Sequence, residues 1–215
     1  MPLHTHGRFP RPQSYLVGTF RDMDYLVHLY QRGAQPFRSL SALSDAEALD
    51  RMRALYLAGA VFWERFKEPE GYWQARKQVE AWLRREFIAK GGRPQSEYPI
   101  YMVWGRSKWM QTEMDAVTRA TTVEIQVPLS AFQENTVSFT YPDSMVSYIL
   151  DQQRDPAYYL PKYHGRVFTF AETRAIVEAN GLPGYRWGTE LPSGLANYIE
   201  AQVWDHEPLR AYVRG

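Results

Sequence analysis

The sequence predicts an α+β protein with a mainly antiparallel or split sheet and several helices. Two long segments in the first half of the chain carry apolar residues at helical spacing. From Tyr98 onward the spacing changes to the alternation of strands, which are separated by turns with Pro, Gly and polar residues. Two long helices therefore precede most of the strands that build the sheet.

The chain opens with a predicted strand at residues 14–19 and a short helix at residues 21–31, which Gly33 ends. Ser44-Asp45-Ala46-Glu47 is a capping box, in which a hydroxyl and a carboxylate three residues later satisfy backbone N–H groups at the start of a helix. The helix that it starts is predicted to run toward Phe62.

The second long helix is predicted at about 72–90, with an apolar stripe on one side and an end at Gly91-Gly92. The stripe consists of Tyr72, Val79, Trp82, Leu83 and Phe87. The later elements are strands at 100–104, 122–127 and 136–141, a helix at 144–153, a strand at 166–168, a helix from Thr169 to Gly181 and a final strand at 197–204.

The 215 residues are predicted to form a single domain, residues 1–215. Hydrophobic residues make up 45% of the chain and charged residues 23%, and there is no apolar run of about 18 residues, which crossing a bilayer requires. Because the first residues also lack the apolar region of a secretory signal, we expect a soluble cytoplasmic protein.

The net charge, the lack of cysteine and the absence of known motifs exclude several classes of protein function. A net charge of +1 gives no overall attraction to phosphate backbones, so non-specific nucleic-acid binding is not expected. The absence of cysteine excludes disulfides, thiolate nucleophiles and cysteine-ligated zinc. The motifs of phosphate-loop NTPases, Rossmann proteins, α/β-hydrolases and zincins are absent. His4 and His6 are spaced like a metal pair, but no carboxylate stands beside them, and we expect no metal site.

Two predicted strands carry polar residues two positions apart, which places each pair on one face of its strand. The pairs are Glu200 with Gln202 and Ser138 with Thr140. Any half-buried strand shows such alternation on its solvent side. Tyr198 and Trp204 share the face of Glu200, however, and solvent seldom faces two large aromatic rings. The pairs are therefore candidates for the edge of one cleft.

In its order of elements the chain resembles the ADP-ribosyltransferase fold family. In that family an early strand and helix supply a pyrophosphate-binding group, a middle strand carries a Ser-x-Ser or Ser-x-Thr motif, and a late strand carries the catalytic glutamate. Residues 14–33 are similar to the opening strand and helix, Ser138-Phe139-Thr140 to the middle motif, and Glu200 to the glutamate. Members commonly place an Arg or His within the first strand; here Arg21 follows the predicted strand.

The resemblance implies an enzyme that binds NAD and transfers ADP-ribose to a protein or nucleic-acid acceptor, or hydrolyses NAD. Glu200 would stabilise the oxocarbenium-like ribose that forms when nicotinamide departs. The residues implied in NAD binding are Arg21 at the pyrophosphate, Ser138, Thr140 and Gln202 around the ribose and Glu200, and Tyr141 or Tyr15 stacking on nicotinamide.

The alternative is a non-catalytic interaction protein or immunity-type protein of the same fold class, which would contact a cognate protein partner through an aromatic loop at residues 158–165. The two hypotheses differ in what they require at Glu200. The enzyme needs an open polar cleft with an Arg or His within reach, whereas the interaction protein tolerates a filled one.

Overall fold

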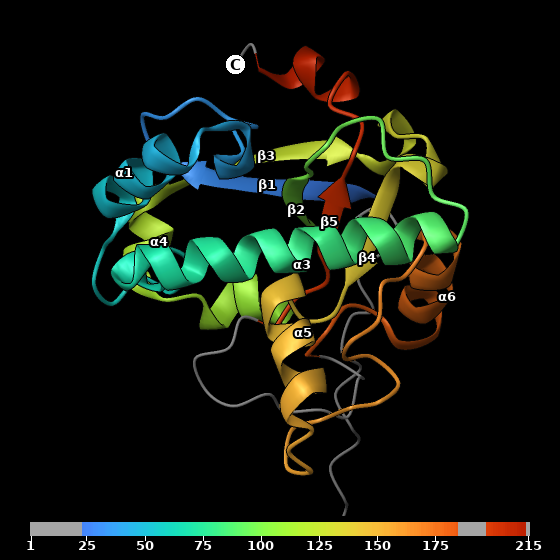
Figure 1. The fold of residues 1–215 in the computed structure, drawn as a ribbon. Helices are drawn as coiled ribbons and strands as arrows, with labels where there is room; N and C mark the ends of the chain where they lie inside the picture. Colours follow the sequence, from blue (N-terminus) through green and yellow to red (C-terminus); the bar gives the residue numbers. More distant parts are fainter. Residues whose placement is uncertain (1–22, 185–196, 214–215) are drawn as a thin grey trace, which may run out of the picture.

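The computed structural model describes residues 23–184 and 197–213. The strands form one antiparallel sheet in the order β3-β1-β2-β5-β4 (Figure 1), which confirms the predicted α+β class. The strands are β1 Tyr25–Gln31, β2 Ile100–Trp104, β3 Thr122–Pro128, β4 Val137–Thr140 and β5 Glu200–Val203. The helices are α1 Asp45–Leu55, α2 Val61–Glu64, α3 Pro69–Ala89, α4 Ala116–Thr121, α5 Ser144–Gln153 and α6 Phe170–Asn180.

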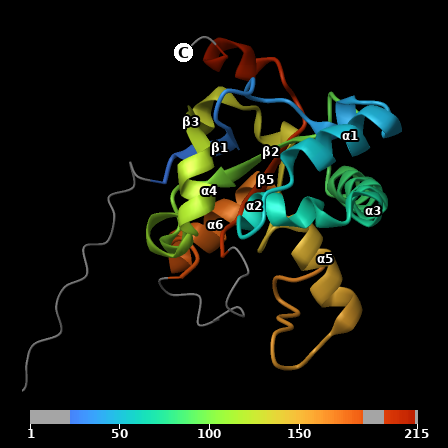
Figure 2. The same ribbon diagram turned by 90° about the vertical axis from the view of Figure 1, so that its left-hand side faces the viewer.

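Helices cover both faces of the sheet. α3 crosses one face with α1 beside it and is seen end-on in Figure 2, whereas α6 lies on the opposite face. Over the described residues, no helix is both long enough and apolar enough to span a membrane. Because both faces of the sheet are covered, a polar side chain on either face needs a partner inside the protein.

The two faces build separate cores. On the α6 side, Phe170 and Val177 pack against apolar residues from all five strands. On the α3 side, Trp204, which follows β5, belongs to a core with residues of the predicted apolar stripe, and this confirms the stripe. The stripe residues in that core are Val79, Trp82, Leu83 and Phe87.

The helix expected at 21–31 is wrong, because Tyr25–Gln31 forms strand β1. β1 lies between β3 and β2 and is covered on both faces. Leu26 packs in the core on the α6 side, and the adjacent Val27 packs in a core that contains Phe62 of α2. A strand buried on both faces carries consecutive apolar residues instead of alternating ones, so the sequence pattern did not distinguish it from a helix.

Two further elements differ from the sequence prediction in their extent. The capping box at Ser44 is confirmed and α1 follows it directly, but α1 ends at Leu55, before the expected Phe62. Gly59 turns the chain with a φ of 76° ahead of α2, a conformation that favours glycine. The strand expected at 166–168 forms only one isolated bridge to β4.

The sheet opens between β1 and β2. β1 pairs with β3 along its whole length, but it pairs with β2 only through Leu26 with Trp104 and Val27 with Val103. Beyond Val27 the two strands are no longer paired. The register aligns Val27 and Val103 with Glu200 of β5, so these three side chains share one face of the sheet.

Candidate functional site

A cavity of about 570 Å³ lies between the open part of the sheet and the helices α1 to α3. Such a volume suits a small-molecule or cofactor site. Four arginines and two acidic residues line it, together with tyrosines. The charged residues of the lining are Arg38, Arg51, Arg65, Arg76, Asp143 and Glu200. The cavity therefore combines a positive charge excess with aromatic surface.

Glu200 of β5 reaches this cavity although only 7% of the residue is exposed. Its Oε2 accepts hydrogen bonds from the Ser144 backbone N–H at 2.9 Å and from Gln202 Nε2 at 3.1 Å. Ser144 is the first residue of α5, so the carboxylate lies at a helix N-terminus, where the helix dipole favours negative charge. The Ser144 side chain also forms a hydrogen bond with Glu200, which favours the ionised carboxylate.

The two predicted polar pairs form one buried hydrogen-bond network. The register sets Ser138 opposite Gln202, and Thr140 opposite Glu200. Ser138 Oγ donates to Gln202 Oε1 at 2.9 Å, and Trp204 Nε1 donates to Ser138 Oγ at 2.9 Å. Gln202 Nε2 donates to Thr140 Oγ1 at 3.0 Å and also to Glu200. The hydroxyls of Ser138 and Thr140 and the amide of Gln202 are fully buried, and this network holds the Glu200 carboxylate in position.

Asp143 is the second carboxylate on this wall. It caps α5 by accepting a hydrogen bond from the Val146 N–H at 2.9 Å. Burial, and secondly the charge of Asp143, raise the pKa of Glu200 to about 7. Desolvation also raises the pKa of Asp143. Glu200 is therefore only partly ionised near neutral pH.

His28 lies where β1 and β2 separate, on the face opposite to Glu200, and is buried. Its Nε2 accepts from the Phe37 N–H at 2.9 Å, so the ring proton is on Nδ1, which donates to Tyr101 O at 3.2 Å. Burial lowers the pKa of His28 to about 4. Phe37 has a φ of 55°, which is unfavourable for a bulky residue. The neutral histidine therefore anchors the loop that walls one side of the cavity.

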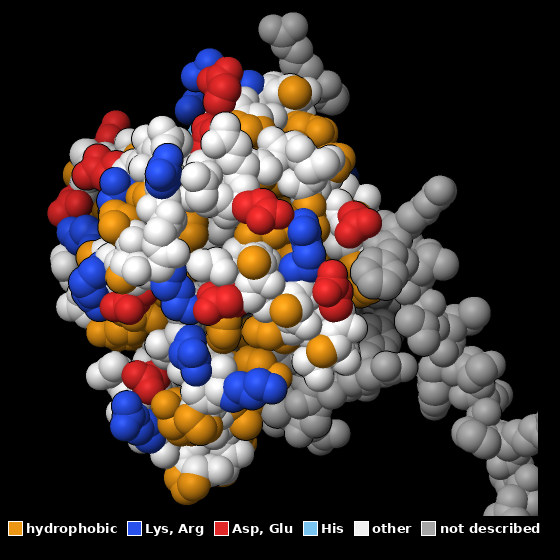
Figure 3. Space-filling view, turned by 90° about the vertical axis from the view of Figure 1, so that its right-hand side faces the viewer, with side chains coloured by type: hydrophobic (Ala, Val, Ile, Leu, Met, Phe, Trp, Pro, Cys, Tyr) orange, Lys and Arg blue, Asp and Glu red, His pale blue; other side chains and the backbone are white. Residues whose placement is uncertain are grey.

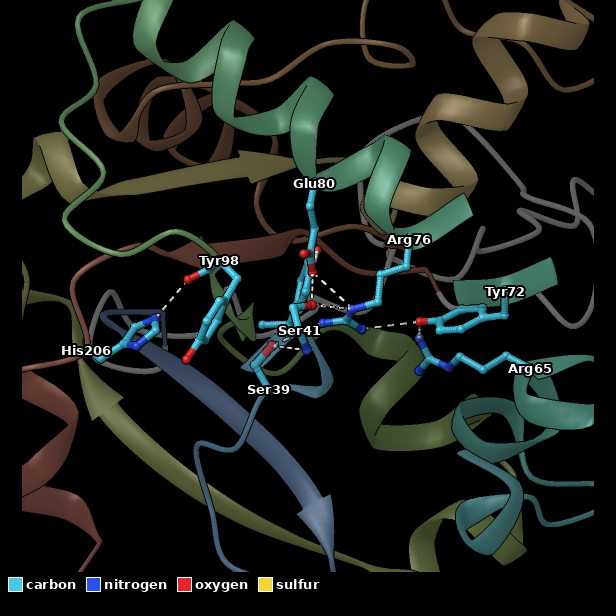
Figure 4. Close-up of polar contacts among 9 residues, drawn as sticks. Ser39, Ser41, Arg65, Tyr72, Arg76, Glu80, Tyr98 and His206 are labelled. Carbon is cyan, nitrogen blue, oxygen red and sulfur yellow. Dashed lines mark hydrogen bonds and ion pairs between the residues drawn. The ribbon is translucent and has the colours of Figure 1, made fainter. Parts of the chain in front are cut away.

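Two guanidinium groups meet on the α3 side of the cavity (Figure 4). Arg76 of α3 and Arg65, which follows α2, each place Nη1 3.5 Å from the Tyr72 hydroxyl oxygen. Arg76 also forms an ion pair with Glu80 at 3.0 Å and donates from Nε to Ser41 Oγ at 2.9 Å. The arginine or histidine that the enzyme hypothesis requires near Glu200 is thus present in the same cavity.

The remaining predicted site residues are Tyr141, Tyr15 and Arg21. Tyr141 is 1% exposed in the core on the α6 side, and its hydroxyl donates to Asn197 Oδ1 at 2.8 Å. Arg21 and the predicted strand at 14–19 are outside the described residues. The two polar pairs are therefore brought together, but Tyr141 does not join them.

Sequence reasoning missed Arg65, Arg76 and Asp143. A signal for Arg76 was present, since it stands four residues after Tyr72 and three before Val79, within the apolar stripe of α3. An arginine is seldom buried in such a stripe unless it is paired or binds a ligand. Asp143 resembled an ordinary helix cap, and Arg65 lies in a short helical turn with no readable period.

Comparison with models of protein families, with curated proteins and with solved structures found no match. The fold and the site define an α+β protein with a positively charged cavity and a buried, oriented glutamate. Its function therefore has to be argued from the chemistry of that cavity.

Proposed function

We propose that the protein is an ADP-ribosyltransferase-like enzyme, which binds NAD in this cavity and transfers ADP-ribose to a protein or nucleic-acid acceptor or to water. The observation that carries the proposal is the environment of Glu200. Its carboxylate is oriented by a buried network and shares the cavity with arginines.

The chemistry needs a carboxylate in this position. The bond between ribose C1′ and the nicotinamide nitrogen breaks, and the electron pair leaves with nicotinamide. The oxocarbenium-like ribose is then stabilised by the ionised Glu200, which also accepts a hydrogen bond from the ribose 2′-hydroxyl. A nucleophile of the acceptor, or water, bonds to C1′ and loses a proton. Ser138, Thr140 and Gln202 act by holding the carboxylate in place.

Aromatic surface for the nicotinamide ring is available beside Glu200. Tyr198 stands two residues before it and lines the cavity. Tyr101 lines the cavity from β2 and lies opposite Gln202 in the register. Either ring offers the stacking surface that the sequence resemblance assigned to Tyr141 or Tyr15.

Nicotinamide release from NAD tests the proposal. Purified wild-type protein should release nicotinamide, and Glu200→Gln, which keeps the shape and the hydrogen-bond acceptor of the side chain, should lower the rate by at least about a hundredfold. Glu97→Gln is the matched control, because Glu97 is exposed and lies outside the cavity lining. Equal rates for the wild type and Glu200→Gln, both folded by circular dichroism, would remove Glu200 from the mechanism.

A second candidate function is non-catalytic interaction through the lobe formed by α5 and the loop after it. This lobe projects from the body of the protein (Figures 1 and 2), and Figure 3 shows hydrophobic and basic side chains together on it. Ile149 is 41% exposed and Tyr158 is 43% exposed. The nicotinamide-release assay distinguishes the two functions, because an interaction protein neither binds NAD nor releases nicotinamide.

A further inference from the structure

We propose that Arg65 and Arg76 form an anion-binding subsite, which takes the phosphate groups of the ligand that occupies the cavity. This inference rests on the proposed function where it assigns those phosphates to NAD. It also assigns the phosphates to Arg65, which follows α2, and to Arg76 of α3, whereas the resemblance implied Arg21.

The charge of the residues that line the cavity is the first observation that supports an anion-binding subsite. The chain carries a net charge of only +1, yet four arginines and only two acidic residues line the cavity. Glu200, whose pKa is raised to about 7, is also only partly ionised near neutral pH. A positive charge excess inside a cavity attracts anionic ligands and raises their local concentration.

The arrangement of Arg65 and Arg76 is the second support. Both guanidinium groups approach one phenolic oxygen, that of Tyr72, at 3.5 Å. Two cations that converge in this way repel each other unless negative charge lies close by. In the described part of the chain, only Glu80 forms an ion pair with either arginine. Arg65 forms no such ion pair, and the carboxylate that acts on its charge is Asp143.

Arg76 is the fixed member of the subsite. Glu80 and Ser41 hold its Nε, and the guanidinium stacks 4.8 Å from the Tyr101 ring. Only 11% of its side chain is exposed. A guanidinium has five N–H donors, and the contacts of Arg76 leave two of them for a ligand.

Arg65 is the member without an ion pair, and Asp143 is the carboxylate that acts on its charge. Its Nε donates to Phe62 O at 2.7 Å, and its guanidinium lies 5.3 Å from the Phe62 ring and 5.9 Å from the Phe66 ring. Nη2 makes no hydrogen bond with any described residue, and no carboxylate of the described chain lies within ion-pair distance. The two aromatic rings orient the guanidinium group of Arg65. Its N–H groups that have no partner among the described residues can donate hydrogen bonds to phosphate oxygens.

Binding of three probes tests the subsite: inorganic pyrophosphate, NAD, and nicotinamide riboside, which has no phosphate. Arg65→Gln should weaken the binding of pyrophosphate and of NAD by at least about tenfold, because it removes a charge-assisted contact. It should leave the affinity for nicotinamide riboside unchanged. Arg65→Lys should weaken the binding of pyrophosphate and NAD by an intermediate factor, since it keeps the positive charge but loses the planar guanidinium group. Arg93→Gln, which is exposed and outside the cavity lining, should change none of the three.

The outcomes separate this inference from the proposed function. If pyrophosphate binds and Arg65→Gln weakens its binding while NAD is neither bound nor cleaved, the subsite stands and the NAD function fails. If NAD is cleaved but Arg65→Gln weakens NAD and nicotinamide riboside equally, the subsite is overturned and Arg65 is a packing residue. Failure of the folded wild type to bind pyrophosphate would also overturn it.

Discussion

Glu200 and His28 are both buried ionisable residues, and their pKa shifts have opposite effects on stability. Each is more easily neutral in the folded protein than in the unfolded chain. Neutral Glu200 requires a bound proton, whereas neutral His28 requires the loss of one. The free energy of unfolding therefore depends on pH in opposite directions at the two residues.

The stability contribution of Glu200 should be lost as the pH rises. Its pKa is about 7 in the folded protein and 4.5 in the reference state, so the folded protein binds more protons between these values. Glu200→Gln should be as stable as the wild type below pH 4.5 and more stable by about 3 kcal/mol above pH 7. Urea unfolding across this range measures the difference, and a constant difference would show that Glu200 ionises normally.

The stability contribution of His28 should be lost as the pH falls. The unfolded chain binds a proton near pH 6.5, whereas the folded protein binds it only near pH 4. The wild type should therefore lose about 3 kcal/mol relative to a non-titrating His28→Gln variant as the pH falls through this window. The same urea titrations test this, and parallel curves for the two proteins would contradict the neutral tautomer.

At the scale of elements, local signals predicted the helices better than the first strand. The capping box at Ser44 and the stripe of α3 depend on residues within a few turns of each other, so the sequence displays them directly. β1 is different, because its identity as a strand depends on β3 and β2, which are distant in the chain. Its consecutive apolar residues follow from burial on both faces.

The candidate site, too, was predictable only where it depends on residues that are close together in the chain. Alternation predicted that Glu200 and Gln202 share a face, but the register that sets Thr140 opposite Glu200 depends on strand pairing between distant segments. Arg65 and Arg76 join the site because α2 and α3 fold back over the sheet. No local pattern contains that information for Arg65, and the place of Arg76 in the apolar stripe of α3 signalled only that it is buried.

The stripe of α3 should contribute strongly to stability. Leu83 is fully buried against the sheet, and Leu83→Ala leaves a cavity that should cost about 3 kcal/mol. Ile88 lies on the same helix and is 49% exposed, so Ile88→Ala should cost less than about 1 kcal/mol. Denaturant unfolding of the two variants compares them, and equal losses would contradict the packing of α3.

At the scale of the whole molecule, the proposed reaction should depend on the carboxylate pair. Glu200 must be ionised to stabilise the ribose cation, so kcat/KM for nicotinamide release should rise as the pH increases through about 7. Asp143→Asn keeps the helix cap but removes the neighbouring charge, so it should move this rise to lower pH. An unchanged midpoint in Asp143→Asn would exclude coupling between the two carboxylates.

The central claim is that NAD binds in the cavity with a ribose against Glu200. A crystal structure of Glu200→Gln grown with NAD tests it most directly, because the variant should bind the ligand without cleaving it. The predicted result is NAD within the cavity, with a ribose hydroxyl in hydrogen-bond distance of the side chain at position 200 and the phosphates against Arg65 and Arg76. NAD bound elsewhere, or an empty cavity at saturating NAD, would contradict the proposed function.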